Sequence, residues 1–220
     1  VGLYDTLRAL TCGHETATNI PFRWQSLNGI EKNMLNFLEN HDEQRIASEF
    51  FAGNPFKAIP AMVVSACMNT NPVMIYFGQE LGEPGMDEEG FSGRDGRTTI
   101  FDYWSVDTLR RWCNDGKYDT ARLTKEEKEL QSIYSQVLNL CNSEEAISDG
   151  TFYDLQYANP NSAVYDACNV YSYLRGTENG QKVDRKRVIS SVSRCLNPYQ
   201  EDGYTEMMKL AVSDDLEYVV

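Results

Sequence analysis

The sequence lacks long apolar runs and a surplus of basic residues, and each absence excludes a class of protein. No run of about 18 apolar residues occurs, so no transmembrane helix is predicted. The chain has 20 Lys and Arg against 33 Asp and Glu, a net charge of −13. This charge argues against a nucleic-acid partner, because phosphate binding requires a basic stripe. A neutral substrate is compatible with it, and so is an acidic surface that only aids solubility.

Paired cysteine motifs and a leader are also missing. Six cysteines occur, but none forms a C-x-x-C pair, so neither a zinc site nor a redox motif of that kind is predicted. Cys67 and Cys141 lie among apolar neighbours at helical positions, where a free Cys behaves as a small hydrophobe. We expect most of the cysteines to be buried thiols, which leaves the compartment open. No charged-then-apolar leader follows Val1, although a mature, processed or truncated start would look the same.

Apolar runs predict a strand–helix–strand unit between residues 34 and 77. Met34–Leu38 and Val73–Phe77 are nearly continuous apolar runs, typical of strands in a parallel sheet covered on both faces. A helix is expected from Asp42 or a neighbour to residue 51. A second helix should open at Asn54 as cap, with Pro55 in its first position. A right-handed crossover would bring the polar ends of both strands to one edge of the sheet.

Helical periodicity appears in other segments. Residues 3–11 place their leucines on one face, and residues 105–114 also read as helical. Thr124 and Glu127 form a capping box that opens a long amphipathic helix through Cys141. Residues 11–25 are expected to be irregular, and residues 26–32 to form a weak helix.

After Glu145 the period changes to two, which predicts an antiparallel β module of about 70 residues. The alternating sets are Phe152/Asp154/Gln156, Val170/Ser172/Leu174, Met208/Leu210/Val212 and Leu216/Tyr218/Val220. We therefore expect two domains, at residues 1–145 and 146–220.

The most informative polar cluster is Asn40-His41-Asp42, which directly follows the first apolar run. In barrels and open parallel sheets the chemistry lies just past the carboxyl ends of the strands, so a catalytic carboxylate is expected there. Gln79 and Glu80 follow the second run. The Gly-rich acidic segment 82–97 is typical of an active-site loop.

Two of these segments resemble signatures of the α-amylase family, glycoside hydrolase family 13. Residues 37–42, Phe-Leu-Glu-Asn-His-Asp, resemble the F-x-x-N-H-D motif at the seventh barrel strand. Residues 71–80 resemble the P-x-I-Y-x-G-x-E pattern of the eighth strand. The β module stands where the family has its small sandwich domain, although Val188–Val192 departs from the usual V-V-V-N-F. The resemblance implies an α/β fold: the C-terminal part of a (β/α)8 TIM barrel followed by a small antiparallel β-sandwich.

The resemblance also implies a retaining attack on α-1,4-glucans, in which two carboxylates act as nucleophile and acid/base. Asp42 matches a third Asp, which stabilises the oxocarbenium-like transition state, and His41 beside Asn40 matches the group that binds sugar hydroxyls. Two interpretations stay open for Glu80, which either lines a sugar-binding subsite or is a solvated loop carboxylate. Arg97 either contacts the substrate or forms a loop salt bridge with Asp95. Without the resemblance, Asp42 would be read as a helix cap.

Several aromatic residues could stack on sugar rings, although aromatic residues more often belong to the core. They are Tyr76, for which core is the prediction, Phe91, Tyr103 and Trp104. The acidic loop lacks the alternate ligand spacing of calcium sites, so no metal ligand and no cofactor are predicted in this chain. The resemblance leaves room for calcium in the parent protein.

Nothing in residues 1–33 resembles the family motifs that carry the nucleophile Asp and the acid/base Glu. A complete barrel takes about 250 residues, more than precede the β module here. We therefore read the chain as the carboxyl-terminal portion of a starch- or maltooligosaccharide-cleaving hydrolase, inactive alone. The alternative is a non-catalytic, carbohydrate-binding or structural relative of the same fold. A partial barrel leaves a raw sheet edge, which predicts a homodimer or another pairing of that edge. The resemblance is compatible with an extracytoplasmic location.

Overall fold

A computed structural model describes most of the chain up to residue 177 and two strands beyond it. The described residues are 2–85, 94–98, 106–163, 165–177, 188–194 and 208–213, the last two ranges by their backbone. The chain divides into two compact units. Unit 1 comprises residues 1–36, 59–73 and 138–220, and unit 2 comprises residues 37–58 and 74–137. The boundary between residues 145 and 146 stays a prediction.

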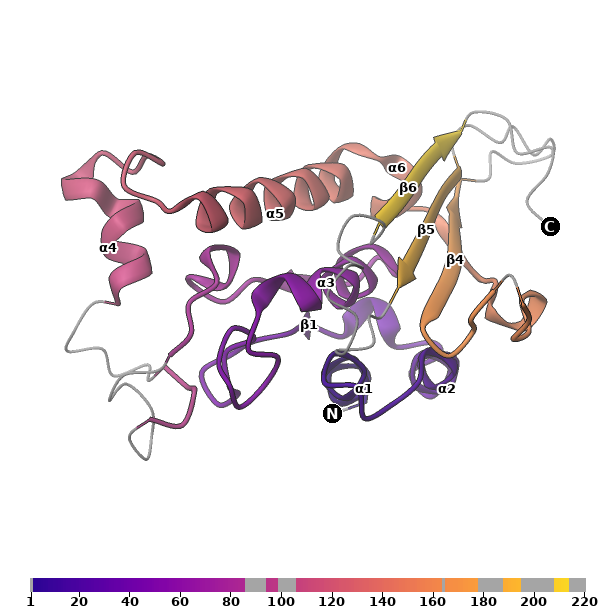
Figure 1. Ribbon diagram of the computed structural model, residues 1–220. Coiled ribbons are helices and arrows are strands. Elements are labelled where there is room, and N and C mark those ends of the chain that lie inside the picture. The colour runs from indigo at the N-terminus through magenta and orange to yellow at the C-terminus, as the bar shows by residue number, and fades with distance from the viewer. Residues whose placement is uncertain are drawn as a thin grey trace. The chain divides into compact units, whose positions relative to one another are not determined.

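Unit 1 contains the amino-terminal helices, a central helix and an antiparallel sheet (Figure 1). Its helices are α1 Leu3–Thr11, α2 Ile20–Gln25, α3 Ile59–Cys67 and α6 Glu145–Ser148. The strands of its sheet are β3 Thr151–Asp154, β4 Val170–Gly176, β5 Val188–Arg194 and β6 Met208–Ser213. Short 3-10 turns lie at Ala17–Asn19, Glu31–Asn33 and Gln156–Ala158.

The prediction for α1 is confirmed, because Leu3, Leu7 and Leu10 are all buried on one face. The expectation of irregular backbone is met at residues 12–16 and was wrong for residues 17–25, which form a 3-10 turn and α2. Pro21 lies in the first turn of α2, where its missing N–H costs no hydrogen bond. Helices α1 and α2 lie side by side (Figure 1), and the Nε of Arg23 donates to the Oγ1 of Thr6 at 2.9 Å.

The weak helix expected over residues 26–32 was also wrong. Only turns and the 3-10 turn Glu31–Asn33 form there. Gly29 adopts a φ of 92°, a left-handed conformation that interrupts any right-handed helix.

Helix α3 is the core of unit 1, with all nine of its side chains buried. The predicted cap is confirmed: the Phe56 N–H donates to the Oδ1 of Asn54 at 2.9 Å. The turn that follows, Pro55–Ala58, is 3-10, and the α-helix itself begins at Ile59. Pro60 therefore lies in the first turn and causes no kink.

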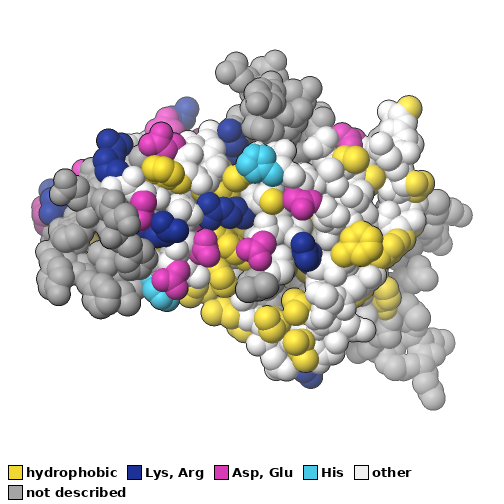
Figure 2. Space-filling view, turned by 90° about the horizontal axis from the view of Figure 1, so that it is seen from below, with side chains coloured by type: hydrophobic (Ala, Val, Ile, Leu, Met, Phe, Trp, Pro, Cys, Tyr) yellow, Lys and Arg dark blue, Asp and Glu magenta, His cyan; other side chains and the backbone are white. Residues whose placement is uncertain are grey.

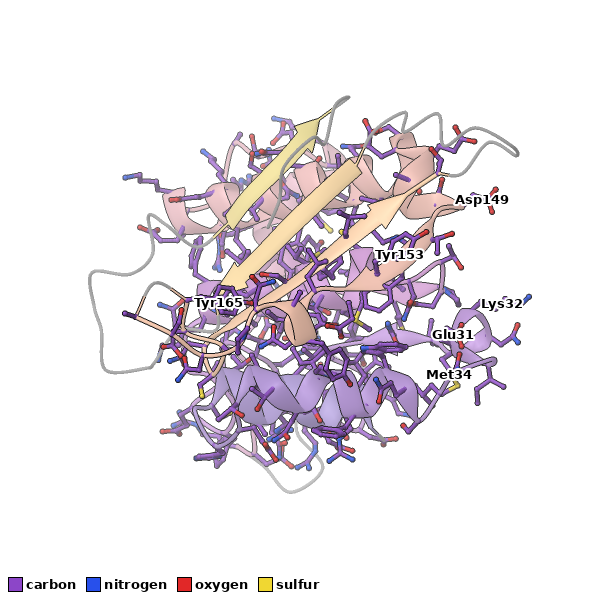
Figure 3. The ribbon with its side chains drawn as sticks, turned by 90° about the vertical axis from the view of Figure 1, so that its right-hand side faces the viewer. Glu31, Lys32, Met34, Asp149, Tyr153 and Tyr165 are labelled. Carbon is purple, nitrogen blue, oxygen red and sulfur yellow. The ribbon has the colours of Figure 1, made fainter. Side chains whose placement is uncertain are left out.

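The carboxyl-terminal β module forms one antiparallel sheet in the order β3-β4-β5-β6. The deeply buried face of β4 is formed by Tyr171, Tyr173 and Arg175, each exposed by at most 1%. These residues alternate with the set named from the sequence. Beside the sheet, the hydroxyl of Tyr165 (labelled in Figure 3) lies 3.0 Å from the Oγ of Ser172 on β4. The sandwich stays a prediction, and residues 216–220 lie outside the described residues.

The strands expected before the two polar clusters are shorter than predicted. They are β1 Asn36–Phe37 and β2 Val73–Met74, which pair with each other. In unit 2 these strands lead into turns. The further elements of this unit are the 3-10 turns Gln79–Leu81 and Asn114–Gly116 and the helices α4 Asp107–Cys113 and α5 Lys125–Ser143. The carboxyl-terminal end of α5 belongs to unit 1.

The helix expected from Asp42 to residue 51 does not form, and turns replace it. A helix would pair the Ile46 N–H with the Asp42 carbonyl. Instead the Ile46 N–H donates to the Oε1 of Glu39 at 2.6 Å, and the Asp42 carbonyl accepts from the Nε of Arg97 at 2.7 Å. The side chains of Glu39 and Arg97 thus bind the backbone donor and acceptor that would form the first hydrogen bond of the helix.

The capping box of α5 is confirmed in both directions. The Thr124 N–H donates to the Oε2 of Glu127 at 2.8 Å, and the Glu127 N–H donates to the Oγ1 of Thr124 at 3.1 Å. Leu130, Tyr134 and Val137 are buried along one face, as the periodicity predicts.

Candidate active site

The candidate site is built on the loop that follows β1. The Oδ1 of Asn40 accepts the N–H groups of Asp42, at 2.8 Å, and Glu43, at 3.0 Å, so this side chain closes a tight turn. The turn presents His41 and Asp42 to solvent, with side chains 48% and 67% exposed. The Nε2 of His41 lies 3.3 Å from the Oδ2 of Asp42. An exposed carboxylate beside an imidazole is able to meet a ligand directly.

A buried ion pair closes the base of this loop. The carboxylate of Glu39, just before the turn, lies 2.8 Å from the Nη1 of Arg45, just after it, and both side chains are at most 2% exposed. Burial raises the pKa of Glu39, while the Arg45 charge and the Ile46 N–H act in the opposite direction. The ion pair thus joins the two ends of the loop formed by residues 40–44.

Arg45 also ties this loop to the segment that follows β2. Its guanidinium carbon lies 4.4 Å from the ring centre of Tyr76 and 4.7 Å from that of Phe77. Its Nε donates to the Oγ1 of Thr98 at 2.9 Å. The Nη2 of Arg45 is buried and has no hydrogen-bond partner among the described residues. Arg45 therefore joins the loop after β1 to the residues that follow β2, and the convergence of Asn40–Asp42 with Gln79 and Glu80 stays a prediction.

Arg97 holds the turn from the other side. Its Nε donates to the Asp42 carbonyl at 2.7 Å, and its Nη1 lies 3.1 Å from the Oδ2 of Asp95. The predicted loop salt bridge to Asp95 is confirmed. The contact with the Asp42 backbone was not foreseen, and it gives Arg97 a means of setting the position of that turn.

Glu80 is half-buried in the 3-10 turn Gln79–Leu81. Burial raises its pKa above the ordinary value of 4.5, and its own backbone N–H, the Arg45 charge and the Gly78 N–H oppose the rise. The turn is fastened by Gln79, whose Nε2 donates to the hydroxyl of Tyr134 at 3.1 Å. Among the described residues, Glu80 makes no side-chain hydrogen bond to Asn40, His41 or Asp42.

Glu39 and Arg45 are the members of this arrangement that sequence reasoning missed. The available signal was an acidic and a basic residue, six positions apart, that flank the polar cluster. The substrate roles of the five predicted residues stay predictions. Phe91, Tyr103 and Trp104 lie outside the described residues, as do residues 86–93 of the acidic loop.

No cluster of three or more potential metal ligands occurs within the described ranges. None of the helices in the described part of the chain is long and apolar enough to cross a membrane. On the described part of the face drawn in Figure 2, acidic and basic side chains are interspersed and form no continuous basic stripe.

An Asp presented just beyond the carboxyl end of a strand lies where catalytic residues of (β/α)8 barrels are placed. The sequence matches the α-amylase catalytic domain over residues 13–190, and the chain belongs to that family, whose fold is the (β/α)8 barrel. The match extends through β3 and β4 to the start of β5. The resemblance inferred from the two strand motifs is thereby confirmed.

Solved structures with a similar fold include amylases and glucanotransferases. AmyP in complex with maltose is 15% identical, with a TM-score of 0.55 and coverage of 88% of this chain and 38% of that one. Gamma-CGTase from alkalophilic Bacillus clarkii is 15% identical, with a TM-score of 0.51 and coverage of 85% and 22%. The cyclomaltodextrin glucanotransferase CldA is 17% identical, with a TM-score of 0.51 and coverage of 87% and 31%.

The chain thus spans well under half the length of each of these structures. At such identities the likeness concerns the fold. No curated protein matches the sequence.

Proposed function

We propose that this chain supplies the transition-state-stabilising part of a retaining glycoside hydrolase that cleaves α-1,4 bonds in starch or maltooligosaccharides. The observation that carries the proposal is the closed turn that holds Asp42 beside His41. Family membership and the maltose bound by AmyP support the substrate class. Retaining cleavage needs two further carboxylates, a nucleophile and an acid/base. In our proposal these come from the part of the parent protein that lies outside this 220-residue chain.

The proposed chemistry is electrostatic. Positive charge develops on the sugar ring as the glycosidic bond breaks, and an ionised Asp42 held in place beforehand stabilises that charge without reorganising. His41 and Asn40 would bind sugar hydroxyls, since a neutral imidazole donates a hydrogen bond without adding a charge. Glu80 and Arg97 are proposed to lie at neighbouring subsites, with Arg97 acting mainly through its hold on the Asp42 turn.

The test uses the full-length protein encoded by the reading frame that contains these residues. Asp42→Asn should lower kcat on maltooligosaccharides by about 100- to 1,000-fold with a much smaller change in KM, because the lost interaction exists only in the transition state. The matched control is Asp149→Asn, at an exposed aspartate labelled in Figure 3, which should keep normal turnover. Near-normal turnover of the Asp42 variant would refute the assignment.

The second function, a non-catalytic carbohydrate-binding relative, makes a different prediction for the same variants. Maltooligosaccharide binding by the full-length protein, with no hydrolysis before or after the Asp42 substitution, would favour it over the hydrolase.

A further inference from the structure

Two cysteines far apart in the sequence meet in the core of unit 1. The Sγ of Cys67, the last residue of α3, lies 3.3 Å from the Sγ of Cys141 near the end of α5, 74 positions along the chain. Both are free thiols, and Cys141 is only partly buried. The Sγ of Cys141 also lies 3.5 Å from the Ala66 carbonyl. A disulfide needs a sulfur–sulfur distance of about 2.05 Å, so little movement separates this contact from a bond.

The backbone around the pair is held by a single buried side chain. The guanidinium of Arg175 donates to the carbonyls of Met68, Ala146, Ile147 and Gly150 at 2.7 to 3.1 Å. Met68 directly follows Cys67, and Ala146 lies five positions beyond Cys141. Arg175 thus fastens the chain next to both thiols, which keeps the two sulfurs in contact and reduces the entropy lost on joining them.

The surroundings also make the two thiols unequal. A hydrogen bond from Cys67 lowers the pKa of Cys141, burial opposes this shift, and the positive charge of Arg175 adds to the lowering. The hydrogen bond to Cys141 and burial raise the pKa of Cys67. Because the thiolate is the nucleophile in disulfide exchange, the more accessible Cys141 is the residue expected to react first.

We propose that Cys67 and Cys141 form a redox site, in which a small-molecule disulfide joins them reversibly and thereby fastens α3 to the end of α5. The Cys141 thiolate attacks one sulfur of the small disulfide and releases one small thiolate. Cys67, after losing its proton, attacks the Cys141 sulfur and releases the second. Two protein thiols are oxidised, one disulfide is reduced to two thiols, and the two protons pass to the released thiolates. The site acts on stability and does not depend on the proposed hydrolase function.

The experiment treats the fully reduced 220-residue chain with oxidised glutathione and follows it by intact mass and peptide mapping. The expected product has lost two hydrogen atoms, carries no glutathione on this pair, and yields one peptide joining Cys67 to Cys141. Its Tm should exceed that of the reduced chain by about 5 °C or more, because the cross-link closes a long loop in the unfolded state. Reduction with dithiothreitol should restore the lower Tm.

Variants separate this site from general thiol reactivity. Cys67→Ala should stop the reaction at a stable glutathione adduct on Cys141, and Cys168→Ala, which removes a half-exposed cysteine outside the pair, should leave the cross-link and the Tm rise intact. A lasting glutathione adduct in the unmodified chain, pairing of Cys67 with another cysteine, or no reaction of the pair would each overturn the proposal. A Cys67–Cys141 bond that leaves Tm unchanged would overturn its fastening role.

Discussion

The carboxylate of Glu39 and the guanidinium of Arg45 lie 2.8 Å apart on either side of the turn that presents Asp42, and both are almost completely buried. The pair therefore serves as the base of the candidate site. Because Arg45 also packs on Tyr76 and Phe77, one buried cation joins the segments that follow β1 and β2.

Removing one partner of this pair should destabilise the chain strongly. Glu39→Ala leaves Arg45 buried without a countercharge, which we expect to lower the free energy of unfolding by about 3–5 kcal/mol. Urea unfolding measures the loss. The double variant Glu39→Ala/Arg45→Met should recover part of it, because it removes the unpaired charge. A single variant as stable as the unmodified chain would show that the pair does not hold the loop.

Arg97 should affect turnover through the position of the Asp42 turn. In the full-length protein, Arg97→Ala should lower kcat roughly 10- to 100-fold, since small misplacements of a catalytic group are costly. The control is Arg122→Ala, because Arg122 forms an exposed pair with Asp115 at 2.5 Å that contributes little. If both variants reduced kcat equally, Arg97 would have no specific positioning role.

Glu80 should make stability depend on pH in a defined direction. Its folded pKa is raised, so the folded state holds this proton more tightly than the unfolded state does. The resulting stabilisation is complete below the ordinary value of 4.5 and is lost as pH rises through the folded pKa. The free energy of unfolding should therefore change with pH differently in the unmodified chain and in Glu80→Gln, when both are measured from below pH 4.5 to above the folded pKa. Parallel curves would contradict the prediction.

Arg175 should be a sensitive position of strand β4. Arg175→Met removes the donor to four carbonyls in a buried environment, and we expect a loss of about 3–5 kcal/mol in the free energy of unfolding. Arg175→Lys should recover only a part, because an ammonium lacks the planar fork. Full stability of the methionine variant in urea unfolding would argue against this role.

The capping box at the start of α5 offers a milder test. Thr124→Ala should cost about 1 kcal/mol, since the Glu127 N–H loses its acceptor, whereas Thr124→Ser keeps the hydroxyl and should cost much less. Equal losses in the two variants would show that the hydroxyl is not the stabilising group.

Local interactions explain what could be read from the sequence. Leu3, Leu7 and Leu10 predict α1, and Thr124 with Glu127 predicts the start of α5, because periodicity and capping act between residues a few positions apart. The two motifs ending in Asp42 and Glu80 were enough to assign the family, now confirmed over residues 13–190. The two motifs were enough because functional residues at the end of a strand must be of particular types and lie within a short segment of the sequence.

The sequence by itself therefore determined the family and the helices α1 and α5, and tertiary contacts decided the form of the site. The helix predicted after Asp42 is replaced by turns because Glu39 and Arg97 take its first backbone hydrogen bond, and Arg97 lies 55 positions away. In the same way, Cys67 meets Cys141, and Arg175 reaches Met68, across more than 70 positions. Such pairs depend on how segments pack, and periodicity along a single segment carries no information about that.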